Sequence, residues 1–347
     1  MCIYTLKETI NLYTSMKGCV FTCFLDASKA FDRVNHSILF EKLARRGVPI
    51  YILRILIYWY ENQRLCIRWG ETMSEYFKVT NGVRQGSVLS SYFFNVYMDD
   101  LSERLNELKI GCMVGALIIN HLLYADDLVL ISPSSRGLHT LIGVCEKYGI
   151  NNDIIFNATK SAVMCFKSKS HLKFNIPEFL LNNAAVPLVN NFKYLGHHLC
   201  ENSSDTIDIE RQRKKIFAQE NTLIRKFFMC TLDVKTKLFE TFCSPLYTAH
   251  LWIKYTNTEI NKLYSAYHSS LKLLVGLPKR EYTSPVFANL SLRTCPAVVR
   301  NLVFRFMGRL RDSSNNLIRA IYNSSLFYQS AIWKHWRSLL YTNVQVF

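Results

Sequence analysis

The sequence lacks the paired cysteines that structural zinc sites and disulfide frameworks need. It has eleven cysteines, an odd number, and no two of them form a Cys-x-x-Cys pair. Cys19 and Cys23 come nearest to one, on an apolar segment without histidines nearby. The adjacent His197 and His198 lie in a strand-like run, so their side chains would point to opposite faces. These absences argue against a zinc site and predict free thiols in a reducing compartment.

Long apolar runs are missing as well. Met1 leads into a charged segment with no hydrophobic signal core, and polar residues interrupt the longest apolar stretch, residues 114–131. A membrane-spanning helix needs roughly 18–20 consecutive apolar residues. The sequence therefore predicts a chain that neither crosses a membrane nor is secreted, and we expect it inside the cell, in the nucleus, the cytoplasm or both.

Acidic residues are scarce, because 26 Asp and Glu stand against 42 Lys and Arg, which gives a formal net charge of +16. Residues 1–200 hold 21 basic and 16 acidic side chains, whereas residues 201–347 hold 21 and 10. Such an excess indicates a polyanionic partner, either nucleic acid or an acidic membrane, and charge alone leaves both open. The missing membrane span weakens the second, so we expect a phosphate backbone to lie along the second part of the chain.

Helix and strand patterns alternate over the first 200 residues, and mostly helical patterns follow from about residue 205. Apolar residues at helical spacing predict helices at 1–17, 35–46, 51–62, 90–108 and 135–148. Short apolar runs predict strands at 19–25, 65–69, 76–80, 117–125, 128–132, 162–166 and 192–199. This order predicts an α/β (α+β) catalytic layer, with an antiparallel sheet and packed helices, followed by an all-α binding region. The best internal break in the second part is Pro278-Lys279-Arg280.

Three segments carry the chemistry. Asp26 ends an apolar strand, residues 81–87 (NGVRQGS) form a glycine-rich loop that opens a helix, and residues 124–127 (YADD) occupy a hairpin tip. Two adjacent carboxylates, with a third from a neighbouring strand, can hold two Mg²⁺ ions roughly 3.5–4 Å apart, as in-line phosphoryl transfer requires. The available ligands are hard oxygens, which favour Mg²⁺, with Mn²⁺ as the alternative.

In this order the three segments resemble motifs A, B and C of reverse transcriptases. The sequences FLDASKAFDRVNH, TNGVRQGSVLS, LLYADDLVLIS and FKYLGHHL are similar to enzymes of LINE-type (non-LTR) retrotransposons, over about residues 19–200. The resemblance implies an RNA-directed DNA polymerase that uses an RNA template, a DNA primer and dNTP, with no obligatory protein partner. It further implies a palm with only a remnant of the fingers (1–200), a basic helical thumb (201–277) and a helical C-terminal region (278–347).

The resemblance also implies residue roles. Asp26 and Asp126 would bridge the metals, Asp127 would be an outer ligand, and Ala27 would offer its backbone carbonyl. Lys160 would be the general acid toward pyrophosphate. The template and nucleotide pocket would be formed by Phe31, as the steric gate, with Arg84, Gln85, Gly86 and Tyr124. The primer grip would be formed by Tyr194, Leu195 and Gly196.

Simpler interpretations stay open for several of these residues. Phe31 is alternatively a core residue, Lys160 a solvated lysine and Arg84 a brace of its own loop. The aromatic residues of the second part, Trp252 and Trp336 among them, either stack on bases or belong to the core. The basic run 211–215 is interpreted as a phosphate-facing helix. Residues 97–100 (YMDD) match the retroviral form of motif C, but they lie in a helical pattern, in which successive side chains point about 100° apart, so we reject them as the catalytic pair.

The family's fingers region lies upstream of motif A, whereas 18 residues precede Cys19 here. We therefore expect a fragment or an N-terminally truncated copy of a longer polyprotein. The alternative to an active polymerase is then a catalytically inactive remnant that only binds nucleic acid. A different two-metal phosphotransferase or nuclease ranks last, because it leaves the glycine-rich loop and the segment 192–199 without an explanation.

Overall fold

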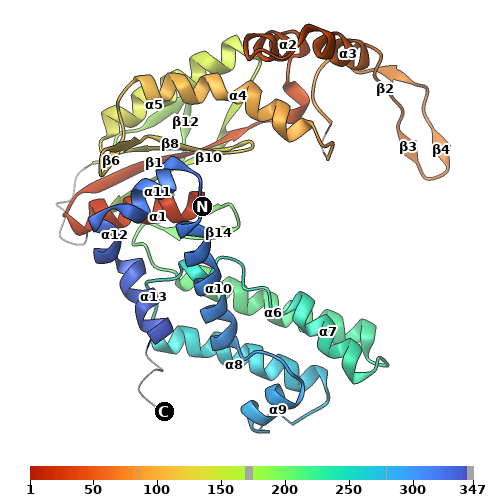
Figure 1. The fold of residues 1–347 in the computed structure, drawn as a ribbon, viewed down its shortest axis with the longest axis vertical. Coiled ribbons are helices and arrows are strands. Elements are labelled where there is room, and N and C mark those ends of the chain that lie inside the picture. Colours follow the sequence, from red (N-terminus) through yellow and green to blue (C-terminus); the bar gives the residue numbers. More distant parts are fainter. Residues whose placement is uncertain (85, 169–174, 279, 342–347) are drawn as a thin grey trace.

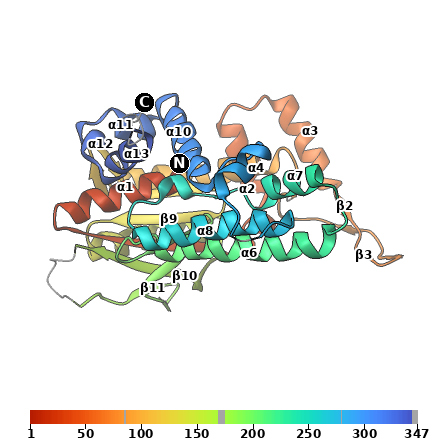
Figure 2. The same ribbon diagram turned by 90° about the horizontal axis from the view of Figure 1, so that it is seen from below.

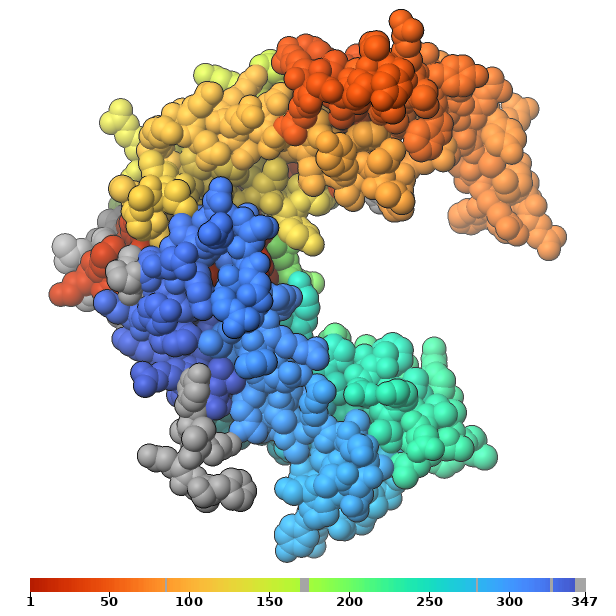
Figure 3. Space-filling view, viewed as in Figure 1, coloured from red at the N-terminus to blue at the C-terminus, as the bar shows by residue number. Residues whose placement is uncertain are grey.

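The computed structural model describes residues 1–84, 86–168, 175–278 and 280–341. Figure 1 shows a C-shaped molecule in which a sheet covered by helices forms the back. One arm, built from residues 36–78, projects above the opening, and a second, helical arm projects below it. The space-filling view in Figure 3 shows that the space between the two arms is a wide, open hollow.

A four-stranded antiparallel sheet forms the centre, with the strand order β10-β1-β9-β8. Its strands are β1 (Cys19–Ala27), β8 (His121–Tyr124), β9 (Asp127–Ser132) and β10 (Phe156–Lys167). Strand β1 is apolar along nearly its whole length because it is buried on both faces. Phe21, Cys23 and Leu25 belong to one core cluster, and Val20 and Phe24 to another.

Helices cover both faces of this sheet. The first cluster contains residues of four helices, α2 (His36–Arg45), α3 (Ile50–Glu61), α4 (Ser90–Glu107) and α5 (Ser135–Asn151). On the opposite face, α1 (Cys2–Ser15) packs with α10 (Cys295–Arg311), α11 (Asn316–Asn323), α12 (Ser325–Gln329) and α13 (Ala331–Tyr341). Tyr4 of α1 contacts the rings of Phe306 and Trp336, so the last helices of the chain pack against the first one.

The upper arm consists of α2, α3 (Ile50–Glu61) and a narrow ribbon that projects from the body in both Figures 1 and 2. The sequence predicted two strands here. The structure divides the ribbon into two short ladders, β2 (Arg64–Leu65) with β5 (Phe77–Lys78) and β3 (Arg68–Trp69) with β4 (Thr72–Met73). Its apolar side chains are largely exposed, and Trp69 is 86% accessible.

Two strands that the sequence predicted as continuous are broken by turns. The predicted strand 117–125 divides into β7 (Leu117–Ile119) and β8, and β7 pairs with β6 (Cys112–Val114) instead. The predicted strand 192–199 is a hairpin of β13 (Asn191–Tyr194) and β14 (His197–Cys200). Leu195 and Gly196 have φ angles of 45° and 79°, and this left-handed backbone reverses the chain between β13 and β14. A further hairpin joins β11 (Phe179–Leu181) to β12 (Ala184–Val186).

The lower arm is helical. Its main elements are α6 (Thr206–Phe227), α7 (Leu232–Phe242) and α8 (Asn257–Leu274), followed by α9 (Thr283–Asn289), and Figure 2 shows α6 beside α8. Helix α10 joins two cores, because Cys295 and Val299 belong to the core of this arm while Val303 and Phe306 belong to the core under the sheet. The division at residue 278 stays a prediction.

The fold class that the sequence predicted is confirmed: an antiparallel sheet with packed helices is followed by an all-helical part. Trp252 and Trp336 are fully buried, so they are core residues and do not form a stacking surface. Within the described ranges, no helix has both the length and the apolar character that crossing a membrane requires.

Candidate functional site

The turn between β8 and β9 presents two neighbouring carboxylates. Tyr124 and Asp127 pair across the hairpin, so Ala125 and Asp126 alone form the connection. Ala125 has a φ of 53°, a left-handed conformation that is strained for a residue with a side chain. Tyr124, Asp126 and Asp127 are all exposed. The tight turn therefore directs polar groups outward at the end of two buried strands.

Asp26 lies directly opposite Asp127 on the neighbouring strand. The two residues are register partners of the antiparallel pair β1–β9, and Asp26 is half-buried. Although Asp127 is exposed, the surrounding protein partly desolvates its carboxylate and raises its pKa, and the negative charges of Asp126 and Asp26 raise it further. The three acids that the sequence singled out are thus close enough to repel one another, and a cation would relieve that repulsion.

The end of β1 holds the next two predicted residues. Ala27 is buried as the last residue of the strand, and the following Ser28 donates its backbone N–H to the carbonyl of Ile155 at 2.8 Å. Phe31 begins the short 3-10 helix η1 (Phe31–Arg33) and is half-buried. Its ring stacks on that of Phe94, with centroids 4.5 Å apart and planes 15° apart. Phe31 therefore has a firm packing partner, and its steric-gate role stays a prediction.

Lys160 lies in an irregular stretch of β10 beside Asp26. The β1–β10 register jumps there, because Phe24 pairs with Ala162 whereas Asp26 pairs with Asn157. The Asn157 side chain accepts the backbone N–H groups of Thr159 and Lys160, at 2.9 and 3.3 Å. The structure thus brings the exposed Lys160 to the side of β1 opposite Asp127, although its role stays a prediction.

Ser161 is a residue of this site that sequence analysis missed. Its hydroxyl accepts the backbone N–H of Asp26 at 3.1 Å and donates to the Asn157 carbonyl at 2.6 Å. It thereby fixes the backbone of the acid within the register jump. The sequence contained no signal for this contact, because an isolated serine in a strand does not reveal a partner 135 positions away.

The glycine-rich loop is attached to the segment that follows β1. Gly82 donates its N–H to the Val34 carbonyl and Val83 to the Phe31 carbonyl, each at 2.8 Å. Gly82 has a φ of 92°, and a Cβ atom on it would lie 2.9 Å from the Asp32 backbone, so only glycine fits. Arg84 and Gly86 are exposed. Gln85, the predicted pocket residue between them, lies outside the described residues.

The β13–β14 hairpin packs on the face of β1 opposite α4 and α5. Phe24 stacks on Phe192 at a centroid distance of 4.5 Å and contacts Tyr194 at 5.3 Å. Tyr194 is buried, and its pKa is raised, chiefly by burial and in part by the charges of Cys2 and Asp127. The turn residues Leu195 and Gly196 are half-buried. The predicted grip segment therefore lies behind the strand that carries Asp26.

The second Asp-Asp pair of the sequence has structural partners. Tyr97, Asp99 and Asp100 lie in helix α4, as the helical pattern predicted, and the Tyr97 ring is buried. Asp99 forms an ion pair with Arg46, and Asp100 pairs with the buried Lys42 at 2.9 Å. These carboxylates join α4 to α2 and are not part of the site formed by Asp26, Asp126 and Asp127.

Divalent cations fit the donor types at the adjoining ends of β1 and β9, but the acids do not form a closed cage. Over the described parts of the chain, no three His, Cys, Asp or Glu side chains are arranged so that they could hold a metal ion. Mg²⁺ commonly binds through one or two carboxylates, several waters and substrate phosphates. The exposed Asp126 and Asp127, with the half-buried Asp26 on the neighbouring strand, match that open kind of site.

Comparison with known proteins identifies the family. The sequence model of the family "Reverse transcriptase (RNA-dependent DNA polymerase)" matches residues 3–199. The chain is 34% identical over 131 residues to a Pol polyprotein of retrotransposable element R2 from Nasonia vitripennis, covering 38% of this chain and 13% of the relative. It is 22% identical over 311 residues to the RNA-directed DNA polymerase from mobile element jockey of Drosophila funebris, covering 86% and 33%.

A solved structure of telomerase from Candida tropicalis, in complex with a fragment of telomeric RNA, has a TM-score of 0.46 and 11% identity, covering 97% of this chain and 47% of that one. The chain spans a third or less of the length of the retrotransposon relatives compared above. The family match nevertheless covers more than half of this chain and contains all three acids. The chain belongs to the reverse transcriptase family and carries a domain of the LINE type.

Proposed function

We propose that this chain performs RNA-directed DNA synthesis, using an RNA template, a DNA primer and dNTP. The observation that carries the proposal is the pairing of Asp26 with Asp127 across β1 and β9, one residue from the turn that presents Asp126. The hollow between the two arms is open beside the sheet, which gives a nucleic-acid duplex room to approach (Figure 3).

The reaction forms a bond between the primer 3′ oxygen and the α-phosphorus of dNTP while pyrophosphate leaves. Two Mg²⁺ ions, or Mn²⁺, would when bound neutralise the phosphates and lower the pKa of the 3′-hydroxyl. Asp26 and Asp126 would hold them, with Asp127 and the Ala27 carbonyl as further ligands. Lys160 would protonate the leaving pyrophosphate, and Phe31 would exclude a 2′-hydroxyl. The strand registers around Asp26 support the roles of the acids, because they bring Asp26 beside Asp127.

The charge distribution supports a nucleic-acid partner. Most of the surplus of basic residues lies after residue 200, and α6 and α7 belong to the arm that borders the hollow. Binding should therefore weaken as salt rises, because bound Lys and Arg release counterions from the phosphate backbone. We also propose an intracellular location, in the nucleus, the cytoplasm or both, which the eleven unpaired thiols support.

A second candidate function is nucleic-acid binding without catalysis. It is favoured by the absence, among the described residues, of three acids already arranged around a metal position. Both candidates predict salt-sensitive binding. Only the first predicts metal-dependent addition of nucleotides.

Primer extension on a poly(rA)/oligo(dT) hybrid, with dTTP and Mg²⁺, separates the two. Asp126→Asn keeps the size of the side chain but removes its charge, and should lower extension at least about a hundredfold. Asp99→Asn is the matched control, because Asp99 belongs to the other Asp-Asp pair and should leave extension within a fewfold. Salt-sensitive binding without extension by the unchanged protein would instead establish the second candidate. Equal losses in both variants would contradict the assignment of Asp126.

A further inference from the structure

A buried carboxylate anchors the first helix of the lower arm. Asp208, in the first turn of α6, has no accessible surface. Its Oδ1 accepts hydrogen bonds from Arg211, at 2.7 Å from Nη2 and 3.1 Å from Nε, and from the His198 backbone N–H at 3.2 Å. Its Oδ2 accepts from Trp252 Nε1 at 2.8 Å. One side chain thereby joins α6, β14 and the segment before α8.

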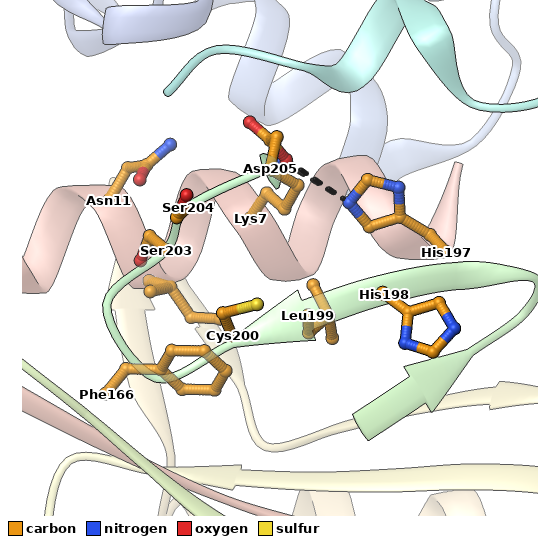
Figure 4. Close-up of a pocket in the computed structure, with 11 residues that line it drawn as sticks. Lys7, Asn11, Phe166, His197, His198, Leu199, Cys200, Ser203, Ser204 and Asp205 are labelled. Atoms are coloured by element: carbon orange, nitrogen blue, oxygen red, sulfur yellow. Dashed lines mark hydrogen bonds and ion pairs between the residues drawn. The ribbon is translucent and has the colours of Figure 1, made fainter. Parts of the chain in front are cut away.

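A second carboxylate extends this cluster to the N-terminal helix. Lys7 of α1 donates to Asp205 Oδ1 at 2.5 Å, and both side chains are almost fully buried. The ring of His197 lies between the two acids, 3.5 Å from Asp205 and 3.1 Å from Asp208. Figure 4 shows Lys7 and His197 converging on Asp205 above the β14 strand. The start of α6 is thus fixed to α1 and to β14.

Arg211 carries this anchorage to the β13–β14 turn. While its guanidinium binds Asp208, Nη2 also donates to the Gly196 carbonyl oxygen at 2.6 Å. On the other side of the turn, a Cβ atom on Gly196 would lie 3.1 Å from the Tyr247 ring. The Tyr247 carbonyl accepts a hydrogen bond from Gln212 at 3.0 Å. Helix α6 therefore holds the Leu195-Gly196 turn through Arg211, and Tyr247, which α6 also binds, lies close beside it.

The neighbouring cations on α6 have different surroundings. Arg213 makes two hydrogen bonds of 2.7 Å to Glu210, on the same helix. Lys214 and Lys215 are exposed. The interpretation of residues 211–215 as one phosphate-facing run is therefore wrong for Arg211, whose guanidinium is taken up by Asp208 and Gly196. Of this run, Lys214 and Lys215 are the cations that remain open to solvent.

The structure assigns to Arg211 the role of a positioning residue that fixes the Leu195-Gly196 turn on α6 and thereby sets where the primer 3′ end lies. This inference rests on the proposed polymerase function and on the primer-grip role of the turn. Arg211 acts through the Gly196 backbone and makes no contact with phosphate.

The test compares Arg211→Ala with Arg211→Lys, Arg213→Ala and Lys215→Ala on one RNA–DNA hybrid whose primer carries 2-aminopurine at its 3′ end. Three quantities are measured: the fluorescence of the terminal base, the dependence of hybrid affinity on salt, and the kcat and primer KM of extension. Hybrid affinity falls as salt rises, and each phosphate contact makes the slope of log K against log salt steeper by about one. Lys215→Ala should therefore make that slope shallower by about one. Arg211→Ala should leave it unchanged.

Arg211→Ala should change the terminal fluorescence and lower kcat about tenfold, with hybrid affinity within about twofold, because a displaced primer end loses alignment. Arg211→Lys should recover part of the terminal fluorescence and part of kcat. If Arg211→Ala does not fold, these two quantities in Arg211→Lys test the inference instead. Arg213→Ala should match the unchanged protein. A salt slope that becomes shallower by about one in Arg211→Ala, or unchanged fluorescence and kcat, would overturn the inference. If the unchanged protein extends no primer, the polymerase function fails, while fluorescence and salt slope still decide the role of Arg211.

Discussion

Replacing Lys7 by Met should destabilise the junction between α1 and α6 by an amount that the structure bounds. The Lys7 ammonium and the Asp205 carboxylate are 2.5 Å apart, with side chains 7% and 1% exposed. Removing one partner of such a buried pair costs about 3–5 kcal/mol, because the other charge stays buried. Asp205 retains two backbone donors, Ile253 at 2.7 Å and Lys254 at 3.0 Å. We therefore expect the lower end of that range, about 3 kcal/mol.

The cost of Lys7→Met should also depend on pH, which provides a second, independent test. Burial opposes ionisation of Asp205, but Lys7 and then His197 outweigh it and lower its pKa from 3.8 to about 2. An acid with a lowered pKa contributes stability that is complete above its ordinary pKa and is lost as pH falls through the lowered value. The cost of Lys7→Met should thus be greatest at neutral pH and should shrink between about pH 4 and 2.

Urea unfolding followed by tryptophan fluorescence measures this cost, and Trp252 reports from within the cluster. The exposed Lys147 provides the control Lys147→Met, which should change the free energy of unfolding by less than about 0.5 kcal/mol. The double variant Lys7→Met/Asp205→Asn should be more stable than Lys7→Met alone, because no unpaired charge remains. A cost of Lys7→Met below about 1 kcal/mol at pH 7, or a double variant in which the two losses simply add, would refute the reasoning.

Three further predictions concern single residues. Asp127→Asn should stabilise the metal-free protein at neutral pH by less than about 1 kcal/mol and so raise its thermal midpoint, because it removes a carboxyl group whose pKa is raised. The gain should vanish below the ordinary pKa of an aspartate, and a lowered midpoint at neutral pH contradicts this. Burial raises the pKa of Glu8 from 4.5 to about 7, so native stability should fall as pH rises between these values; Glu8→Gln should remove this fall, by at most about 3 kcal/mol at pH 8, and unfolding curves of equal pH dependence would speak against it. Gly82→Ala should destabilise by about 2 kcal/mol or more in thermal unfolding, because its Cβ meets the Asp32 backbone, whereas Gly143→Ala, with open space around it, should not.

Asp26, Asp126 and Asp127 could be found from the sequence because their signals are local. An apolar run that ends in Asp26 predicts a buried strand with an exposed terminus, and a pair of acids between two apolar runs predicts a hairpin tip. The same logic separated residues 126–127 from residues 99–100, since the latter continue a helical pattern. The structure confirms both secondary-structure contexts.

Other features depended on contacts that no local pattern encodes. The turn at Leu195-Gly196 was missed, because Leu195 in a left-handed conformation looks like any strand residue in the sequence. Ser161 reaches Asp26 only because β10 changes register beside it. Arg211 was grouped with its basic neighbours, although three residues earlier Asp208 supplies a buried partner.

The sequence by itself determined the alternation of helices and strands before about residue 200, the helical character after it, the three acids at the ends of apolar runs, and the basic character of the second part. Each of these follows from side chains within a few positions of one another. The tertiary structure alone decided that Asp26 pairs with Asp127, that α10 joins two cores, and that Lys7, His197 and two aspartates form one buried cluster. The physical reason is that burial and charge pairing depend on which distant segments pack together, and a chain specifies this only through the sum of all its contacts.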